Sequence, residues 1–471
     1  MGATGGIDAP NFGTSAFPRL SRCFLSMPVF FFGLGLYRAW IEIAFIGSAF
    51  PAVFEGFCGQ DVFDASMAAT LLICALAFRN RGFVCGRRWV YIFSGTALLA
   101  ATLLLFAVGA LPKPFVAPVA ATSAILGGGG VAFVILLWSE LYSRLDSVRV
   151  VLCYSVSMAL AAFAVYVCLG LLPAWFMAAA ALLPLASLAC VAAGFGVLPE
   201  SDPSQSRRAS IRTPWTLIAL MAMFAAAYGM GSRDAETFVL GPHSALGTLA
   251  VAVVLFAYVS LRRQRLDVDA LCRFALPIPA AALLVAPAIG GFSREAADFC
   301  MNASCAAFSV FAMVVCAGLS RSCGLSPVWI FGIERAARAL ACMAGRHAGS
   351  LIAPFADPRQ AAGVLMLACA VAFAGALLVR RDAFRWWEWV FADRGRDEVL
   401  YEKRCRALAS ECGLSAREEE VLALLGRDEG LAAIERELVI AEGTAKTHIR
   451  HVYCKTGVHS RRELMERLGV R

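Results

Sequence analysis

Long apolar segments alternate with short polar ones along most of the chain. A membrane-crossing helix needs roughly 20 mostly apolar residues, and about twelve such runs precede residue 380. From Arg380 onward the sequence mixes polar and apolar residues as a soluble domain does. The predicted spans are Phe24–Ile46, Val62–Phe78, Trp89–Leu111, Phe115–Trp138, Val148–Leu171, Ala174–Leu198, Trp215–Gly231, Ser244–Leu261, Phe274–Gly290, Ala296–Leu319, Ser326–Ile352 and Gln360–Val379.

Composition agrees with a membrane protein. Of the 471 residues, 60% are hydrophobic and 16% are charged, whereas soluble domains are about half apolar and a quarter charged. The sequence contains no nucleophile–base set, no nucleotide motif and no Cys/His cluster with zinc spacing. We therefore expect a polytopic membrane protein that is not an enzyme and holds neither a metal nor a cofactor.

The charges between the spans predict the orientation. Cytoplasmic loops carry an excess of Lys and Arg, and with a cytoplasmic N-terminus the loops assigned to the inside are the Arg-rich ones. An even number of spans returns the C-terminus to the cytoplasm, so we expect a multi-pass protein of the cell (inner) membrane. The inside loops hold Arg79, Arg81, Arg87, Arg88, Arg144, Arg149, Arg207, Arg208, Arg212, Arg262, Arg263, Arg265, Arg273 and Arg321.

A polar linker divides the membrane part into two groups of six spans. Pro199–Pro214 is rich in Ser and Pro, and Arg79–Arg88 is a Gly- and Arg-containing loop after the second predicted span. This 6+6 arrangement resembles the major facilitator superfamily, in which two six-helix halves are joined by a cytoplasmic loop. That family has an acidic residue in the corresponding loop, and this chain has Asn80 near that position instead. The resemblance implies a bundle of two six-helix halves.

Charged residues inside two spans are candidate ligand or coupling residues. Arg38 and Glu42 lie four residues apart in the first span, as do Glu334 and Arg338 in the eleventh, with Arg335 between them. Ionisable groups in membrane spans are costly and often functional. The alternative is that each pair neutralises itself across one helical turn and only fixes the position of its helix.

A run of four glycines, Gly127–Gly130, lies inside the fourth predicted span. No Lys-Ser/Thr follows it, so it does not match a phosphate-binding loop. Small residues in membrane helices allow close helix contact, and we expect that role here.

The C-terminal tail predicts four short helices. Ser415 and Glu418 form a capping box at the start of the first helix, which buries Val421, Leu422 and Leu425 and stops at Gly426. The second helix, about Leu431–Leu438, presents Ile434 and Leu438 to the same core.

The third predicted helix has the features of a helix that binds DNA. It is predicted at about Thr444–Lys455, after a turn at Ile440–Gly443 in which Gly443 can take a strained backbone angle. Gly457 ends it, and Ser460 with Glu463 caps the fourth helix. A basic amphipathic helix after a sharp turn fits the major groove. Its candidate DNA-contacting residues are Thr444, Lys446, Thr447, His448, Arg450, His451 and Lys455.

The tail resembles the LuxR-type (FixJ/NarL-type) helix-turn-helix family. The first helix matches the family pattern at Leu414, Ser415, Arg417, Glu418, Glu420, Val421 and Leu422. The recognition segment matches at Glu442, Gly443, Thr444, Lys446, Thr447, His448 and Ile449. The last helix matches at Lys455, Gly457, Val458, Ser460, Arg461, Glu463 and Leu464. The resemblance implies that Lys446, Thr447 and Arg450 make most DNA contacts and that Lys455 contacts a phosphate.

Three positions depart from the family pattern. Glu435 replaces a small Ala, Ala441 replaces a capping Ser or Thr, and Ala445 replaces a branched Val. A missing cap costs about 1 kcal/mol if no other group replaces it. We expect these departures to affect DNA affinity more than the fold.

The sequence thus predicts an all-α protein in four parts. These are a cytoplasmic tail (1–23), a membrane sensor domain (24–379), a juxtamembrane linker (380–411) and a helix-turn-helix domain (412–471). The leading hypothesis is a bacterial membrane-bound one-component transcription regulator that senses a small molecule or membrane signal and binds DNA, as a homodimer through its C-terminal domain. The alternatives are a transporter with a regulatory tail and a tail that binds proteins rather than DNA.

Overall fold

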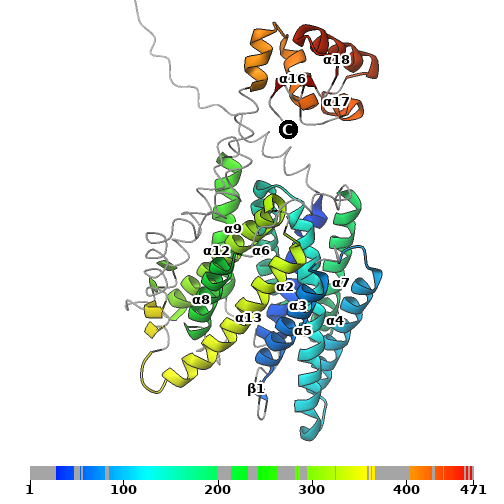
Figure 1. Ribbon diagram of the computed structural model, residues 1–471. Coiled ribbons are helices and arrows are strands. Elements are labelled where there is room, and N and C mark those ends of the chain that lie inside the picture. The colour runs from blue at the N-terminus through cyan, green and yellow to red at the C-terminus, as the bar shows by residue number, and fades with distance from the viewer. Residues whose placement is uncertain are drawn as a thin grey trace, which may run out of the picture. The chain divides into compact units, whose positions relative to one another are not determined.

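A computed structural model of the protein describes most of the apolar region and most of the C-terminal tail. The described residues are 28–46, 53–54, 57–79, 84–198, 214–231, 242–262, 282–283, 285–286, 294–323, 325–357, 360–361, 363–365, 404–426, 430–438, 440–460, 463–464 and 467–468. The chain forms two compact units, Met1–Trp386 and Trp387–Arg471 (Figure 1).

Six helices of the first unit are long and apolar enough to cross a membrane. Each follows one of the predicted spans to within a few residues, which confirms those spans as long apolar helices. They are α3 (Gly59–Phe78), α4 (Arg88–Val108), α5 (Lys113–Ser143), α6 (Ser147–Leu169), α7 (Pro173–Val197) and α12 (Arg294–Cys323).

Four other predicted spans also contain helices. Three of them are α8 (Trp215–Gly231), α9 (Pro242–Arg262) and α13 (Pro327–Ile352). The first predicted span contains η1 (Val29–Phe32), α2 (Leu34–Ile41) and the π-helical turn η2 (Glu42–Ile46). The two remaining predicted spans, 274–290 and 360–379, lie largely outside the described residues. The described residues therefore provide six candidate spans of full length, where the sequence predicted about twelve.

A two-stranded hairpin is the exception to the helical architecture. Strands β1 (Val53–Phe54) and β2 (Phe57–Cys58) pair antiparallel, Val53 opposite Cys58 and Phe54 opposite Phe57. The hairpin leads directly into α3.

The glycine run of α5 allows close helix packing, as expected. A Cβ atom at Gly128 would lie 2.5 Å from the carbonyl oxygen of Phe63 in α3, and one at Gly130 would lie 2.8 Å from Leu98 in α4. Without a Cβ, the backbones approach to a distance that no other residue permits. This helix is buried from Gly127 to Ser143 and forms the centre of the first half of the unit.

An ion-pair cluster joins α3 to α13. The guanidinium of Arg346 lies 2.8 Å from the Asp61 carboxylate and 2.6 Å from that of Asp64. The His347 ring lies 3.1 Å from Asp61. Because these helices belong to the first and second groups of predicted spans, the cluster ties the two groups together.

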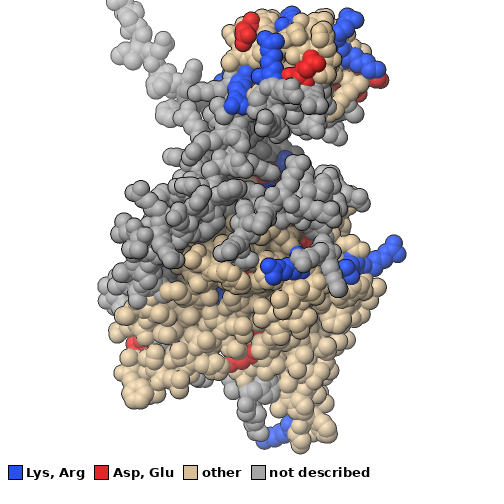
Figure 2. All heavy atoms as spheres, in the orientation of Figure 1, with Lys and Arg blue, Asp and Glu red and all other residues tan. Residues whose placement is uncertain are grey.

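The outer surface of the first unit is apolar. Large hydrophobic side chains such as Ile73, Leu76, Phe163 and Leu182 are 60–68% exposed. Figure 2 shows that face of the unit as mostly uncharged, with Lys, Arg, Asp and Glu confined to small areas. An exposed apolar surface of this extent needs lipid as its solvent.

Candidate nucleic-acid interface

The second unit is built around one apolar core. A helix over residues 404–411 packs with α16 (Ala416–Gly426), α17 (Leu431–Leu438), α18 (Glu442–Thr456) and the helical residues 463–464 and 467. The core residues predicted from the sequence are confirmed as buried or partly buried. They are Val421, Leu422, Leu425, Ile434 and Leu438, and the same core includes Ile449, Val452, Leu464 and Leu468.

The helix over residues 404–411 is part of this core. Cys405, Leu408 and Ala409 are buried in it, and Cys412 packs against it. The first three lie in the segment predicted as a linker (380–411), and Cys412 begins the segment predicted as the domain. Their spacing of three to four residues is that of one helical face, and it was the available signal for this helix.

The capping box at the start of α16 is confirmed. The Ser415 amide donates to Glu418 Oε2 at 2.7 Å, and the Glu418 amide donates to Ser415 Oγ at 3.3 Å. At the fourth helix, the Glu463 amide donates to Ser460 Oγ at 3.2 Å, while the Glu463 carboxylate accepts from the His459 amide at 2.8 Å. That bond lowers the pKa of Glu463.

Gly457 ends α18, as predicted, in a left-handed conformation with φ of 66°. The Val458 amide donates back to Tyr453 O at 3.1 Å, the bond of a Schellman motif. The expectation for Gly443 was wrong. Because α18 begins at Glu442, Gly443 lies in its first helical turn, and among the described glycines only Gly413 and Gly457 have positive φ.

One face of α18 is open to solvent. Its inner face carries the buried Ala445, Val452 and Thr456. The exposed face carries Gly443, Thr444, Lys446, Thr447, Arg450, His451, Cys454 and Lys455. A helical rod with a continuous exposed face, three of whose side chains carry positive charge, is the element that a major groove can accept.

Lys446 is paired within its own helix. Its ammonium lies 2.6 Å from Glu442 Oε1, and both side chains are 62% exposed. The pair raises the pKa of Lys446 and lowers that of Glu442, and Glu435 of α17 adds to the shift of Lys446. Ion pairs this exposed contribute little to stability and break readily when a partner approaches.

Two other predicted DNA-contacting residues are partly bonded or partly buried within the domain. The Thr447 hydroxyl donates to Gly443 O at 2.8 Å, which leaves its methyl group and lone pairs for a partner. His448 is half-buried, and its Nδ1 is buried without a hydrogen-bond partner among the described residues. Arg450, in contrast, is exposed on the open face.

Lys455 and His451 both face the buried Glu418. Lys455 Nζ lies 2.7 Å from Glu418 Oε2 and donates to Gly413 O at 3.2 Å. His451 Nδ1 lies 3.4 Å from the other carboxylate oxygen. The bond from Lys455, followed by the Ser415 amide, lowers the pKa of Glu418 to about 2. The local sequence pattern predicts Glu418 only as half of a capping box, and this second role depends on a residue 37 positions away.

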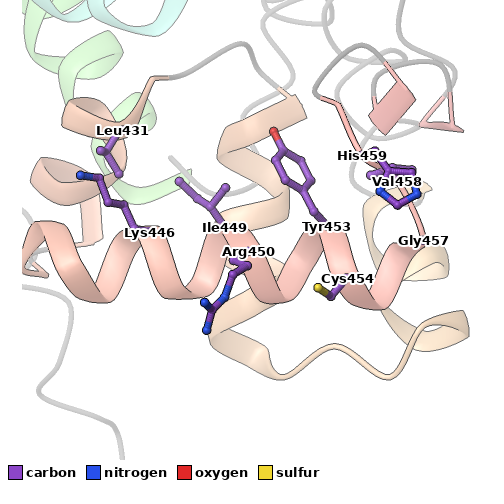
Figure 3. Close-up of a pocket in the computed structure, with 9 residues that line it drawn as sticks. All are labelled: Leu431, Lys446, Ile449, Arg450, Tyr453, Cys454, Gly457, Val458 and His459. Carbon is purple, nitrogen blue, oxygen red and sulfur yellow. The ribbon is translucent and has the colours of Figure 1, made fainter.

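A groove of about 530 Å³ runs along one flank of α18 (Figure 3). Its walls include Leu431 of α17, together with Ile449 and Tyr453 of α18, and Lys446 extends beside Leu431. Arg450 also lines this groove, and in this view its side chain extends in a different direction from that of Lys446. Two cations of α18 therefore border the groove.

The three residues that depart from the family pattern lie at different places in the folded domain. Ala441 is the N-cap of α18 and makes no side-chain cap, Ala445 is fully buried, and Glu435 is half-buried.

The charged residues of the first unit form a second candidate site. Glu334 is buried between Arg335 and Arg338, at 3.3 and 3.5 Å. Arg38 Nη1 donates to the Tyr154 hydroxyl at 3.5 Å, and Glu42 acts on Arg38 electrostatically.

Charges from both groups of spans meet in this region. Arg335 of α13 interacts electrostatically with Tyr37 of α2 and Tyr154 of α6. The structure thus brings the two charged segments, about 300 positions apart in the sequence, into one electrostatic neighbourhood.

Comparison with known proteins identifies the tail alone. Residues 413–468 match the family model GerE, described as bacterial regulatory proteins of the luxR family. No curated protein matches the chain significantly. The C-terminal segment is therefore a LuxR-family helix-turn-helix domain, in a chain whose described residues include six helices of membrane-spanning length and composition.

Proposed function

We propose that the protein is a membrane-bound one-component transcription regulator. The observation that carries this proposal is the open cationic face of α18, within a LuxR-family domain of a chain whose other unit exposes apolar helices. A signal received in the bundle changes the exposure, order or pairing of the tail, and thereby its binding to DNA.

In this proposal α18 enters the major groove. Arg450 and Lys446 donate to guanine edges or phosphates, and Thr447 offers its methyl group to thymine. Thr444, His448, His451 and Lys455 lie on the same helix. Lys455 adds positive charge beside the phosphates while it holds Glu418. Two copies bind half-sites about 34 Å apart.

The bundle is proposed to span the membrane about twelve times in two groups of six, with both termini in the cytoplasm, as in the major facilitator superfamily. Its signal site is the charged region that contains Arg38, Glu42, Glu334 and Arg338, with Arg335 between the last two. Support comes from Arg38 and Arg335, which both interact electrostatically with Tyr37 and Tyr154. A ligand acts only if it binds one state of the bundle more tightly than the other.

A transporter with a regulatory tail is the second candidate. The Arg346 cluster with Asp61 and Asp64 favours it, because ion pairs between two groups of helices can break and re-form as a bundle alternates between states. Uptake of a radiolabelled compound by a tail-deleted protein would support this alternative.

Chromatin immunoprecipitation of the intact protein, with and without candidate ligands, tests the regulator directly. We expect wild type to enrich discrete promoter regions and the double variant Lys446→Ala/Arg450→Ala to lose that enrichment at equal protein level. An Arg149→Ala variant, which removes an exposed cation of the other unit, serves as the control and should enrich the same regions. Equal enrichment by the double variant, or a reporter fusion placing residue 471 outside the cell, would refute the proposal.

A further inference from the structure

We infer that the Glu442–Lys446 pair reads one G·C base pair in each half-site, with Glu442 as the acceptor for the cytosine N4 amino group. This inference rests on the proposed DNA binding and adds to it a residue that determines sequence preference. DNA phosphates repel a carboxylate. The position of Glu442 on a surface proposed to face DNA therefore needs an explanation.

The pair lies where base contacts are made. Glu442 is the first residue of α18, and Lys446 follows one turn later on the exposed face. In helix-turn-helix complexes the N-terminal residues of the recognition helix contact base edges. Gly443 beside them has no heavy atom within 4 Å of the place of a Cβ, so a base edge can approach this turn closely.

The chemistry of the pair matches one base pair. In the major groove, G·C presents the cytosine N4 amino donor beside the guanine O6 and N7 acceptors. Glu442 Oε1 and Lys446 Nζ, 2.6 Å apart, present an acceptor beside a donor. The two sets are complementary, while A·T places its donor and acceptors differently and adds a thymine methyl group.

The two carboxylates near Lys446 favour its contact with a base over a purely electrostatic contact with a phosphate. Glu442 pairs with its ammonium directly, and Glu435 acts on it from α17. Because two carboxylates compensate its charge, Lys446 adds less to sequence-independent binding than Arg450 does. What the pair retains, even when the exposed ion pair opens to a base, is an acceptor and a donor on side chains one helical turn apart.

The test uses the full chain in lipid nanodiscs and selection from randomised duplex DNA, followed by titration of defined duplexes at one salt concentration. Wild type should select a motif containing an invariant G·C pair. In Glu442→Gln, the preference for G·C over A·T at that one position should fall about tenfold, which is in the range of a single base contact. This variant should also bind random DNA more tightly, because one repelled charge is removed.

Glu437→Gln is the matched control. It removes one exposed carboxylate from α17 of the same domain, so it reports the effect of charge alone, and it should leave every base preference unchanged. If Glu442→Gln keeps the wild-type preference at every position, the inference is wrong while the proposed function stands. If wild type selects no motif and Lys446→Ala/Arg450→Ala binds DNA as wild type does, the proposed function itself fails.

Discussion

Lys455, near the end of α18, donates a 2.7 Å hydrogen bond to the carboxylate of Glu418 near the start of α16. The Glu418 side chain is only 6% exposed, whereas that of Lys455 is 41% exposed. Since the same carboxylate accepts from the Ser415 amide, one residue both caps α16 and holds the helix that carries the proposed DNA-binding face.

Lys455→Ala should therefore destabilise the C-terminal domain. It leaves the Glu418 carboxylate without its main partner, and we expect a loss of about 2 kcal/mol, since the pair is only half desolvated. Hydrogen exchange of the α16 and α18 amides in the full chain measures the loss. Lys446→Ala, which breaks an exposed pair, should leave the protection of these amides nearly unchanged. Equal protection in Lys455→Ala and wild type would contradict this account.

The stability of this domain should fall at acidic pH through Glu418. Its pKa is about 2 in the folded domain, below the ordinary value of 4.5. A lowered carboxylate pKa stabilises the fold above the ordinary value, and that contribution is lost as pH falls from about 4.5 towards 2. Hydrogen exchange corrected for intrinsic rates should show α16 opening across that window. In Glu418→Gln the same window should produce a smaller change; an identical pH profile would exclude Glu418 as the cause.

Ala441→Ser should stabilise α18. Ala441 has the extended conformation of an N-cap, φ of −69° and ψ of 152°, but no capping side chain. A Ser hydroxyl there can accept from an amide of the first turn, and we expect a gain of about 1 kcal/mol in the opening free energy of that turn. Ala441→Val supplies no acceptor and should give no gain. Equal hydrogen-exchange rates of the first-turn amides of α18 in the Ser and Val variants would contradict this prediction.

Gly443→Leu should separate folding from DNA binding. No atom stands near the place of its Cβ and its backbone is helical, so the domain should fold at least as well as wild type. The added side chain occupies the turn that faces DNA, and affinity should fall at least about tenfold, the loss of one good base contact. Fluorescence anisotropy with a selected duplex measures affinity. Unchanged affinity would place this turn away from DNA.

Two neighbouring glycines of α5 should respond differently to the same substitution. Gly128→Ala places a methyl group 2.5 Å from Phe63 O, whereas at Gly129 the nearest atom is 3.7 Å away. We expect the first variant to lower the temperature of irreversible aggregation in detergent and the second to leave it nearly unchanged. Size-exclusion chromatography after heating distinguishes them, and equal behaviour would show that α3 and α5 can separate at low cost.

The sequence alone determined the features that depend on local pattern. Runs of apolar residues predicted the long helices because a membrane span must satisfy its own backbone hydrogen bonds. Ser415 with Glu418, and Gly457, predicted where helices begin and end because capping depends on residues within one turn. The LuxR-type motif likewise predicted α18 as the DNA-binding helix from the residues of one short segment.

Tertiary structure decided which distant residues act together. No local rule connects Lys455 to Glu418, Arg346 to Asp61, or Arg335 to Tyr37, because these contacts are made by helices that meet only when the chain has packed. The start of α18 at Glu442 placed Gly443 inside a helix, where the sequence had suggested a turn. Local pattern fixes the helices, and packing fixes which of their charged side chains face one another, since that depends on the mutual rotation of helices and not on spacing along the chain.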